Sequence, residues 1–230
     1  MAAATAESSS PVSVVTALYL HTRKLHVEAE RTGIIRDLLR GEADCEGYVL
    51  LLRNLFPAYQ AMERGLERHR GSPGLGALAD YRLDRAPAIE SDLVALYGRH
   101  WSRDIPLLAA GETYASRIAQ AAEGDGAGLI AHAYTRYLGD LSGGQILQRL
   151  LARSLELRPS ELTFYDFPRY ADLDSLKADY RKTLDEAGAV LPDAHAVVEE
   201  GAIAFTHNIA VSCAVKSMVL RGSAETTAVE

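Results

Sequence analysis

Apolar positions in this chain recur mostly at the three- and four-residue spacing of amphipathic α-helices. No segment alternates apolar and polar residues as a strand does, and there is no internal repeat or linker. A stretch with two prolines, 158–172, is expected to be irregular. The pattern predicts a single all-α domain. Its expected helices cover about 12–31, 33–40, 44–69, 86–98, 111–122, 128–157, 172–187 and 192–219.

The ends of the chain differ in composition from the domain between them. Residues 1–12 are small and polar and lack the basic and apolar regions of a secretory signal, so we expect them to be disordered. Residues 13–221 form the predicted domain, and the polar residues 222–230 a flexible tail. No uninterrupted apolar run of about 20 residues is visible, so we expect no membrane anchor.

Composition narrows the class of protein. A length of 230 residues suits one domain with a substantial core. The net charge of −7 argues against nucleic acid as a partner. Cys45 and Cys213 are the only cysteines and form no Cys-x-x-Cys motif, which favours a reducing compartment. We therefore expect a cytoplasmic protein.

The most informative segment is 134–145, Tyr-Thr-Arg-Tyr-Leu-Gly-Asp-Leu-Ser-Gly-Gly-Gln, inside the helix predicted over 128–157. Each of its glycines, Gly139, Gly143 and Gly144, costs a helix roughly 0.5–1 kcal/mol relative to alanine. A helix tolerates this cost where it bends or where something approaches its backbone closely. The three glycines therefore indicate that this helix bends here or that another group lies against its backbone.

Helical geometry places the glycines beside an ionisable pair, Arg136 and Asp140, within about 140° of arc. A broad, flat ligand could lie on such a face. The alternative is close helix packing through Gly-x-x-x-Gly, with Arg136 and Asp140 as a solvated pair. Leu-Ser-Gly-Gly-Gln at 141–145 also matches an ABC-transporter signature, but the chain has no Gly-Lys dipeptide and hence no phosphate-binding loop.

The longer run 131–145 resembles the distal-helix signature of the heme oxygenase family, and the resemblance extends from about Leu18 to about Val219. It implies an all-α, single-domain heme oxygenase-like fold that holds heme between a proximal N-terminal helix and a distal helix kinked at glycine. It also implies oxidative cleavage of heme by O2 to biliverdin, carbon monoxide and ferrous iron. Heme would be both cofactor and substrate.

Candidate proximal residues lie on the first predicted helix, where Tyr19, Arg23, His26 and Glu30 share one stripe. Taken alone, this stripe is more typical of an ordinary exposed polar face. The family resemblance in 25–30, Leu-His-Val-Glu-Ala-Glu, implies that His26 is the iron ligand and that Glu30 orients its ring.

The resemblance also implies heme contacts elsewhere in the chain. On the distal side, Gly139, Gly143 and Gly144 would admit the heme, Asp140 would hold a catalytic water, and Phe205 would touch the ring. The rest of the distal polar network would be Arg136, Tyr59, Tyr114 and Asn208. The heme propionates would meet Arg23, Tyr134, Lys177 and Arg181, although the two residues on the late helix also suit a solvated basic patch. Tyr19 departs from the family, many of whose members have lysine there, and His132 is expected to be structural.

Electrons must come from another protein, because no flavin, NAD or iron–sulfur motif is present. A ferredoxin or a flavin reductase is the expected donor, docking on basic residues at the propionate edge, namely Arg23, Lys24, Lys177, Arg181 and Lys182. One rival interpretation is a heme carrier or sensor on the same fold. A di-iron carboxylate protein is excluded, because no Glu-x-x-His pair occurs.

Overall fold

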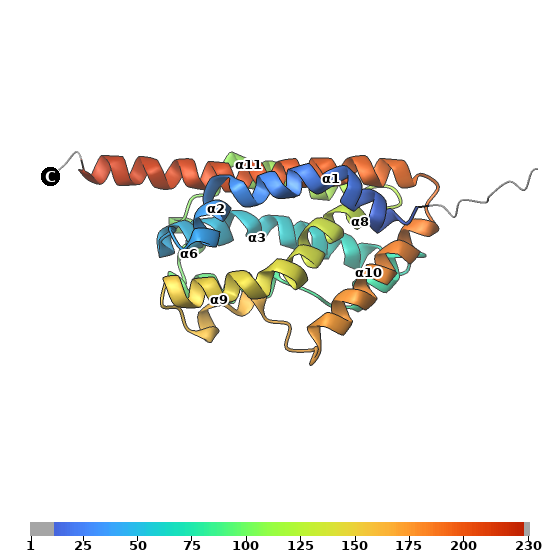
Figure 1. Cartoon of the computed structure of the whole chain (residues 1–230), viewed down its shortest axis with the longest axis horizontal. Helices are drawn as coiled ribbons and strands as arrows, with labels where there is room; N and C mark the ends of the chain where they lie inside the picture. Colours follow the sequence, from blue (N-terminus) through green and yellow to red (C-terminus); the bar gives the residue numbers. More distant parts are fainter. Residues whose placement is uncertain (1–11, 228–230) are drawn as a thin grey trace, which may run out of the picture.

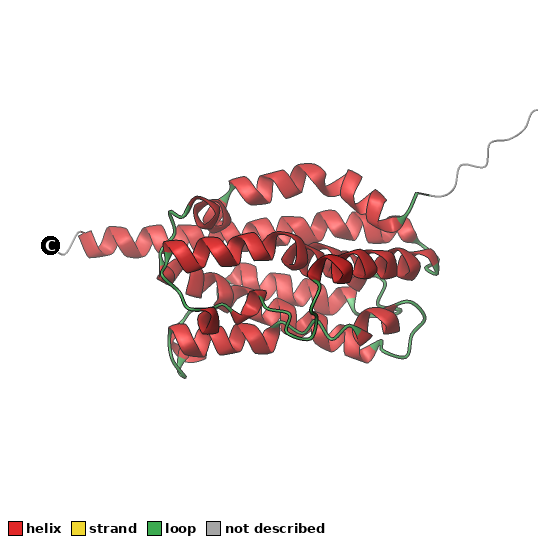
Figure 2. Ribbon diagram, turned by 60° about the horizontal axis from the view of Figure 1, so that its bottom comes forward, coloured by secondary structure: helices red, strands yellow, loops and turns green. Residues whose placement is uncertain are grey.

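The computed structural model describes residues 12–227, with side chains up to Gly222. Every regular element in this part of the chain is a helix, which confirms the predicted all-α fold (Figures 1 and 2). The α-helices are α1 (Val14–Arg31), α2 (Gly33–Arg40), α3 (Cys45–Arg68), α4 (Leu75–Asp80), α5 (Ala86–Leu96), α6 (Trp101–Asp104), α7 (Ala109–Ala121), α8 (Gly128–Ala133), α9 (Gln145–Ser154), α10 (Leu173–Ala189) and α11 (Ala194–Thr227). The remaining helical turns are η1 (Tyr134–Leu138), η2 (Asp140–Gly144), η3 (Pro159–Glu161) and η4 (Thr163–Tyr165).

Helix α3 forms the centre of the core. It begins at Asp44, whose carboxylate accepts the Gly47 amide at 2.8 Å as an N-cap. Along the helix, Tyr48, Leu52 and Tyr59 are completely buried. Helices α5, α7 and α11 pack around α3, and charged residues such as Arg53, Arg64 and Glu67 share its remaining face.

Helices α1 and α11 lie side by side along one edge of the molecule (Figure 1). Their close approach depends on Gly201 of α11, where a Cβ would come within 2.4 Å of the Leu18 side chain. At its beginning, α1 is also held by α10, because the Val15 amide donates to the Asp185 carboxylate at 2.8 Å. Helix α1 is therefore anchored chiefly through α11 and α10.

The long helix predicted over 128–157 is a rod in which two wide π-helical segments, η1 and η2, separate α8 from α9. Figure 1 shows the rod changing direction between α8 and α9, as expected from the glycines. Wide turns of this kind are frequent at functional sites. The predicted kinked helix is confirmed, and the irregularity coincides with Gly139, Gly143 and Gly144.

Helix α11 bears on two expectations. It continues to Thr227, so the predicted tail boundary at 222 falls inside it, because each further residue adds one backbone hydrogen bond to an existing helix. Its segment Ala194–Gly222 is also long and apolar enough to span a membrane by composition, although polar residues interrupt it. The segment packs on α1, α2, α3, α7 and α8. The expected disorder of 1–12 concerns residues that, except for Val12, lie outside the described part of the chain, as do 228–230.

Candidate active site

A cavity of about 320 Å³ lies between α1 on one side and the glycine-rich segment of the rod on the other. Its volume is within the range of small-molecule sites. Apolar side chains from α2, α3 and α9 form part of its wall, namely Ile35, Leu51, Leu55 and Leu147. Several predicted site residues also line it: His26, Glu30, Tyr134, Arg136, Gly139, Asp140, Gly143, Gly144, Arg181, Phe205 and Asn208. The structure thus brings predicted site residues from α1, η1, η2, α10 and α11 to one place.

The distal wall is bare backbone at two glycines. A Cβ built on Gly139 or Gly143 would have no heavy atom of the described residues within 4 Å. Gly139 has ordinary right-handed helical angles, φ −63° and ψ −48°, so its conformation does not require glycine. Gly144 differs, because a Cβ there would lie 3.0 Å from the Tyr165 ring. Packing within the protein explains Gly144 but leaves Gly139 and Gly143 for a ligand.

The opposite wall carries His26. Its ring lies edge-on to Phe205, with centroids 5.8 Å apart, and its Nδ1 is 3.8 Å from the Glu30 carboxylate. That separation is an ion-pair distance and too long for the hydrogen bond predicted from the sequence. The His26 Nε2 makes no hydrogen bond within residues 12–222, which leaves this nitrogen free to bind a metal.

Behind the distal glycines, Tyr59 connects the ionisable pair. Its hydroxyl donates to the Asp140 carboxylate at 2.6 Å and accepts N–H groups of Arg136 at 2.6 and 2.8 Å. Arg136 also donates to the Asn208 side-chain oxygen at 2.7 Å, and its guanidinium is 3.6 Å from Asp140. Four predicted distal residues from three parts of the chain therefore form one connected network.

Burial changes the acidity of this network. It raises the pKa of the Asp140 carboxyl, while the Arg136 charge and the Tyr59 hydrogen bond act in the opposite direction. Burial also raises the pKa of Tyr59 well above its usual value, so its hydroxyl stays protonated and can donate. Asp140 is consequently more ready to hold a proton than an exposed aspartate.

Tyr114 and His132 do not line the cavity. The ring of Tyr114 stacks on His207, with centroids 5.7 Å apart, and its buried hydroxyl has no hydrogen bond in the described structure. Tyr114 therefore has no hydrogen bond to the distal network in the described structure, and its expected place in that network stays a prediction. His132 is fully buried and lies 2.9 Å from the Glu200 carboxylate, a placement that fits its predicted structural role.

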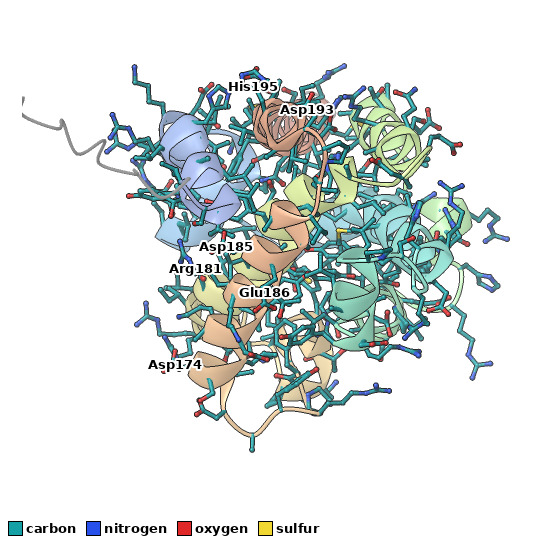
Figure 3. All side chains as sticks on the ribbon, turned by 90° about the vertical axis from the view of Figure 1, so that its right-hand side faces the viewer. Asp174, Arg181, Asp185, Glu186, Asp193 and His195 are labelled. Atoms are coloured by element: carbon teal, nitrogen blue, oxygen red, sulfur yellow. The ribbon has the colours of Figure 1, made fainter. Side chains whose placement is uncertain are left out.

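Only some of the residues predicted to contact the heme propionates line the cavity. Arg181 lines the cavity from α10, on the side of that helix towards α1 (Figure 3). Lys177, one turn away, instead pairs with Asp174 at 3.4 Å and does not line the cavity. Arg23 lines an outer hollow on α1 that shares His26 and Tyr19 with the cavity.

Comparisons with known proteins decide the family. The heme oxygenase family model matches residues 12–214. The chain belongs to the heme oxygenase family. Heme oxygenase 1 of Nostoc sp. is 37% identical over 193 residues, covering 84% of this chain and 81% of the relative. Human heme oxygenase 1 is 34% identical over 204 residues, covering 87% and 71%.

Solved structures agree with this assignment. The heme complex of heme oxygenase-1 from Synechocystis matches with a TM-score of 0.84 and 31% identity, covering 94% of this chain and 98% of that chain. Heme oxygenase from Leptospira interrogans matches with a TM-score of 0.81 and 32% identity, covering 88% and 99%. The protein is accordingly an oxidoreductase that degrades heme to biliverdin.

Heme fits the residues present. A free imidazole nitrogen on one wall, bare glycine backbone on the other and a guanidinium at the rim suit an iron porphyrin with carboxylate side chains. Sequence reasoning missed Phe164 and Tyr165, which line the cavity from the irregular connection, and Ser212 on α11. No local signal identifies Phe164 and Tyr165, because the packing of η4 against η2 brings their connection to the cavity. Ser212 likewise reaches the cavity only through the packing of α11 on α2.

Proposed function

We propose that His26 binds the heme iron through Nε2 and that the heme lies against the backbone at Gly139 and Gly143. The open space at both glycines carries this proposal, since no packing or conformational reason for them exists within the described protein. Glu30 would move from its 3.8 Å separation into hydrogen-bond reach of Nδ1, which would orient the imidazole and raise its basicity. Phe205 packs edge-on against the His26 imidazole ring.

When bound, heme supplies both the iron that activates dioxygen and the meso carbon that is oxidised. Asp140 would hold a water at the distal face and pass protons through it, since its pKa is raised by burial. Tyr59 and Arg136 hold the carboxylate in a fixed orientation. No distal histidine lines the cavity among the described residues, so this wall offers backbone and water rather than a peroxidase-like acid.

Turnover of hemin tests these roles. With one equivalent of hemin, air and ascorbate, we expect loss of the Soret band, biliverdin absorption and release of carbon monoxide. Asp140→Ala should lower the rate of biliverdin formation by about 100-fold or more, because general acid catalysis typically contributes at least that much. With hydrogen peroxide in place of ascorbate, the variant should instead oxidise a peroxidase dye. Normal biliverdin yield from Asp140→Ala would contradict the assignment.

A stable Soret band through repeated reduction of the wild-type protein would instead indicate a heme carrier or sensor. The connected Asp140–Tyr59–Arg136–Asn208 network favours the enzyme, because a carrier has no need to deliver protons at the distal face.

We propose that a ferredoxin or flavin reductase supplies the electrons at the rim where Arg23 and Arg181 lie, and that the protein acts in the cytoplasm. Lys24 and Lys182 are exposed and could steer an acidic partner there. Reversing both charges to glutamate should slow turnover with the protein donor and leave ascorbate-driven turnover unchanged. Equal rates with the protein donor would refute docking at this edge.

A further inference from the structure

We propose that Ser212 is a positioning residue for the proximal wall: it fixes the junction between α1 and α2, and through this junction the distance of His26 from the distal glycines. The inference concerns a residue of α11 that does not touch His26. It rests on the proposed role of His26 as the iron ligand.

The junction is a sharp turn without a cap of its own. Thr32 is extended, at φ −127° and ψ 160°, and Gly33 is left-handed, at φ +59°. The Thr32 hydroxyl donates back to the Glu28 carbonyl at 2.8 Å and makes no capping hydrogen bond to an amide of α2. One of the free amides at the start of α2 must therefore be satisfied by another part of the chain.

Ser212 supplies that partner. Its hydroxyl accepts the Ile35 amide at 3.1 Å and donates to the Thr32 carbonyl at 3.2 Å. A serine N-cap makes the first of these bonds from the neighbouring sequence, whereas here the cap comes from a residue 177 positions away. Since Ser212 is only 2% exposed, bulk water has little access to replace it.

The approach of α11 to the junction is as close as two backbones allow. A Cβ on Gly33 would lie 2.4 Å from both the carbonyl carbon and the hydroxyl oxygen of Ser212. One turn further along α11, Lys216 pairs with the buried Asp37 of α2 at 2.5 Å. The junction and α2 are thus fastened to the same helix at two points.

The fastened junction is an end wall of the cavity. Ser212 lines the cavity, together with Ala29 and Glu30 of α1 and Ile35 of α2. His26 lies six residues before Thr32, about 9 Å along the helix axis, so a shift of the junction moves its imidazole as well. Loss of the Ser212 hydrogen bonds removes one of the two attachments near the end of α1 closest to the iron site, while Asp185 still holds the other end.

Amide hydrogen exchange of the apo protein provides the first test. Ser212→Ala should speed exchange of the Ile35 amide roughly tenfold, the factor that corresponds to one lost buried hydrogen bond. Exchange should also accelerate in α1 around His26 and remain unchanged in α3. Ser217→Ala, the same change at an exposed position of α11, is the matched control and should alter none of these. Faster exchange confined to Ile35 would overturn the proposal.

The hemin complex provides the second test. In Ser212→Ala we expect weaker hemin binding and a shifted or broadened iron–imidazole stretch in the resonance Raman spectrum of the ferrous protein. A merely structural cap would lower thermal stability without moving that band. An unchanged stretch and dissociation constant would reject the positioning role. Failure of the wild-type protein to bind hemin would reject the proposed function instead. The hydrogen-exchange experiment would then still test whether Ser212 holds the junction between α1 and α2.

Discussion

Replacing Gly139 with alanine should stabilise the apo protein and weaken heme binding. Gly139 is right-handed helical, and a methyl group there would meet no heavy atom of the described chain within 4 Å. Alanine is favoured over glycine in such a position by about 0.5–1 kcal/mol. For a domain of this size the unfolding midpoint should rise by roughly 2–4 °C per kcal/mol, so we expect a gain of about 1–4 °C.

The same methyl group should be harmful once the ligand is bound. It would extend about 1.5 Å from the backbone into the cavity, where the proposed porphyrin must lie in contact with the helix. Overfilling a packed contact costs about 1–3 kcal/mol. Hemin affinity should therefore fall by roughly 5- to 150-fold. Two effects of opposite sign from one methyl group distinguish a ligand surface from a helix-packing surface.

The assay combines thermal unfolding of the apo protein, followed by circular dichroism, with a spectroscopic hemin titration. Gly144→Ala is the matched control, because its methyl group would lie 3.0 Å from the Tyr165 ring and should not stabilise the apo protein. Hemin affinity of Gly139→Ala equal to that of the wild type would refute the reasoning. Destabilisation of its apo form would show that Gly139 is needed for packing.

Two other residues, His26 and Glu63, give further predictions. His26→Ala should abolish the histidine-ligated hemin spectrum, and added imidazole should restore it in part if His26 is the ligand; a wild-type spectrum would exclude His26. Burial raises the pKa of Glu63 to about 7, above its ordinary value of 4.5, so its ionisation favours the unfolded chain as pH rises between these values. Glu63→Gln should thus gain stability relative to the wild type, by up to about 3 kcal/mol, between pH 4.5 and 7 in chemical denaturation. A pH-independent difference would contradict the burial of this carboxyl.

The local pattern of apolar residues and glycines determined where most helices form and where the rod is irregular. Helical periodicity predicted the longer α-helices but not the short helices α4 and α6. Gly41 ends α2 in a left-handed conformation at φ +69°, which glycine adopts without strain. The glycines within 134–145 correctly indicated where the rod is irregular. These features depend on residues near one another in the chain, so the sequence expresses them directly.

The family resemblance extended the prediction to residues that periodicity could not assign, such as Tyr59 and Asn208. Their roles depend on partners 77 and 72 positions away, Arg136 in both cases. Contacts that depend on side-chain direction stay predictions. Lys177 turns to Asp174, and the Tyr114 hydroxyl forms no hydrogen bond in the described structure.

Only the tertiary structure showed why individual glycines are present. Gly139, Gly144 and Gly33 look alike in the sequence, yet the first faces open space, the second meets Tyr165, and the third admits the backbone of α11. It also revealed that Ser212 caps a helix 177 residues away in sequence. Such contacts arise from the packing of distant segments, and a pattern of neighbouring residues carries no record of them.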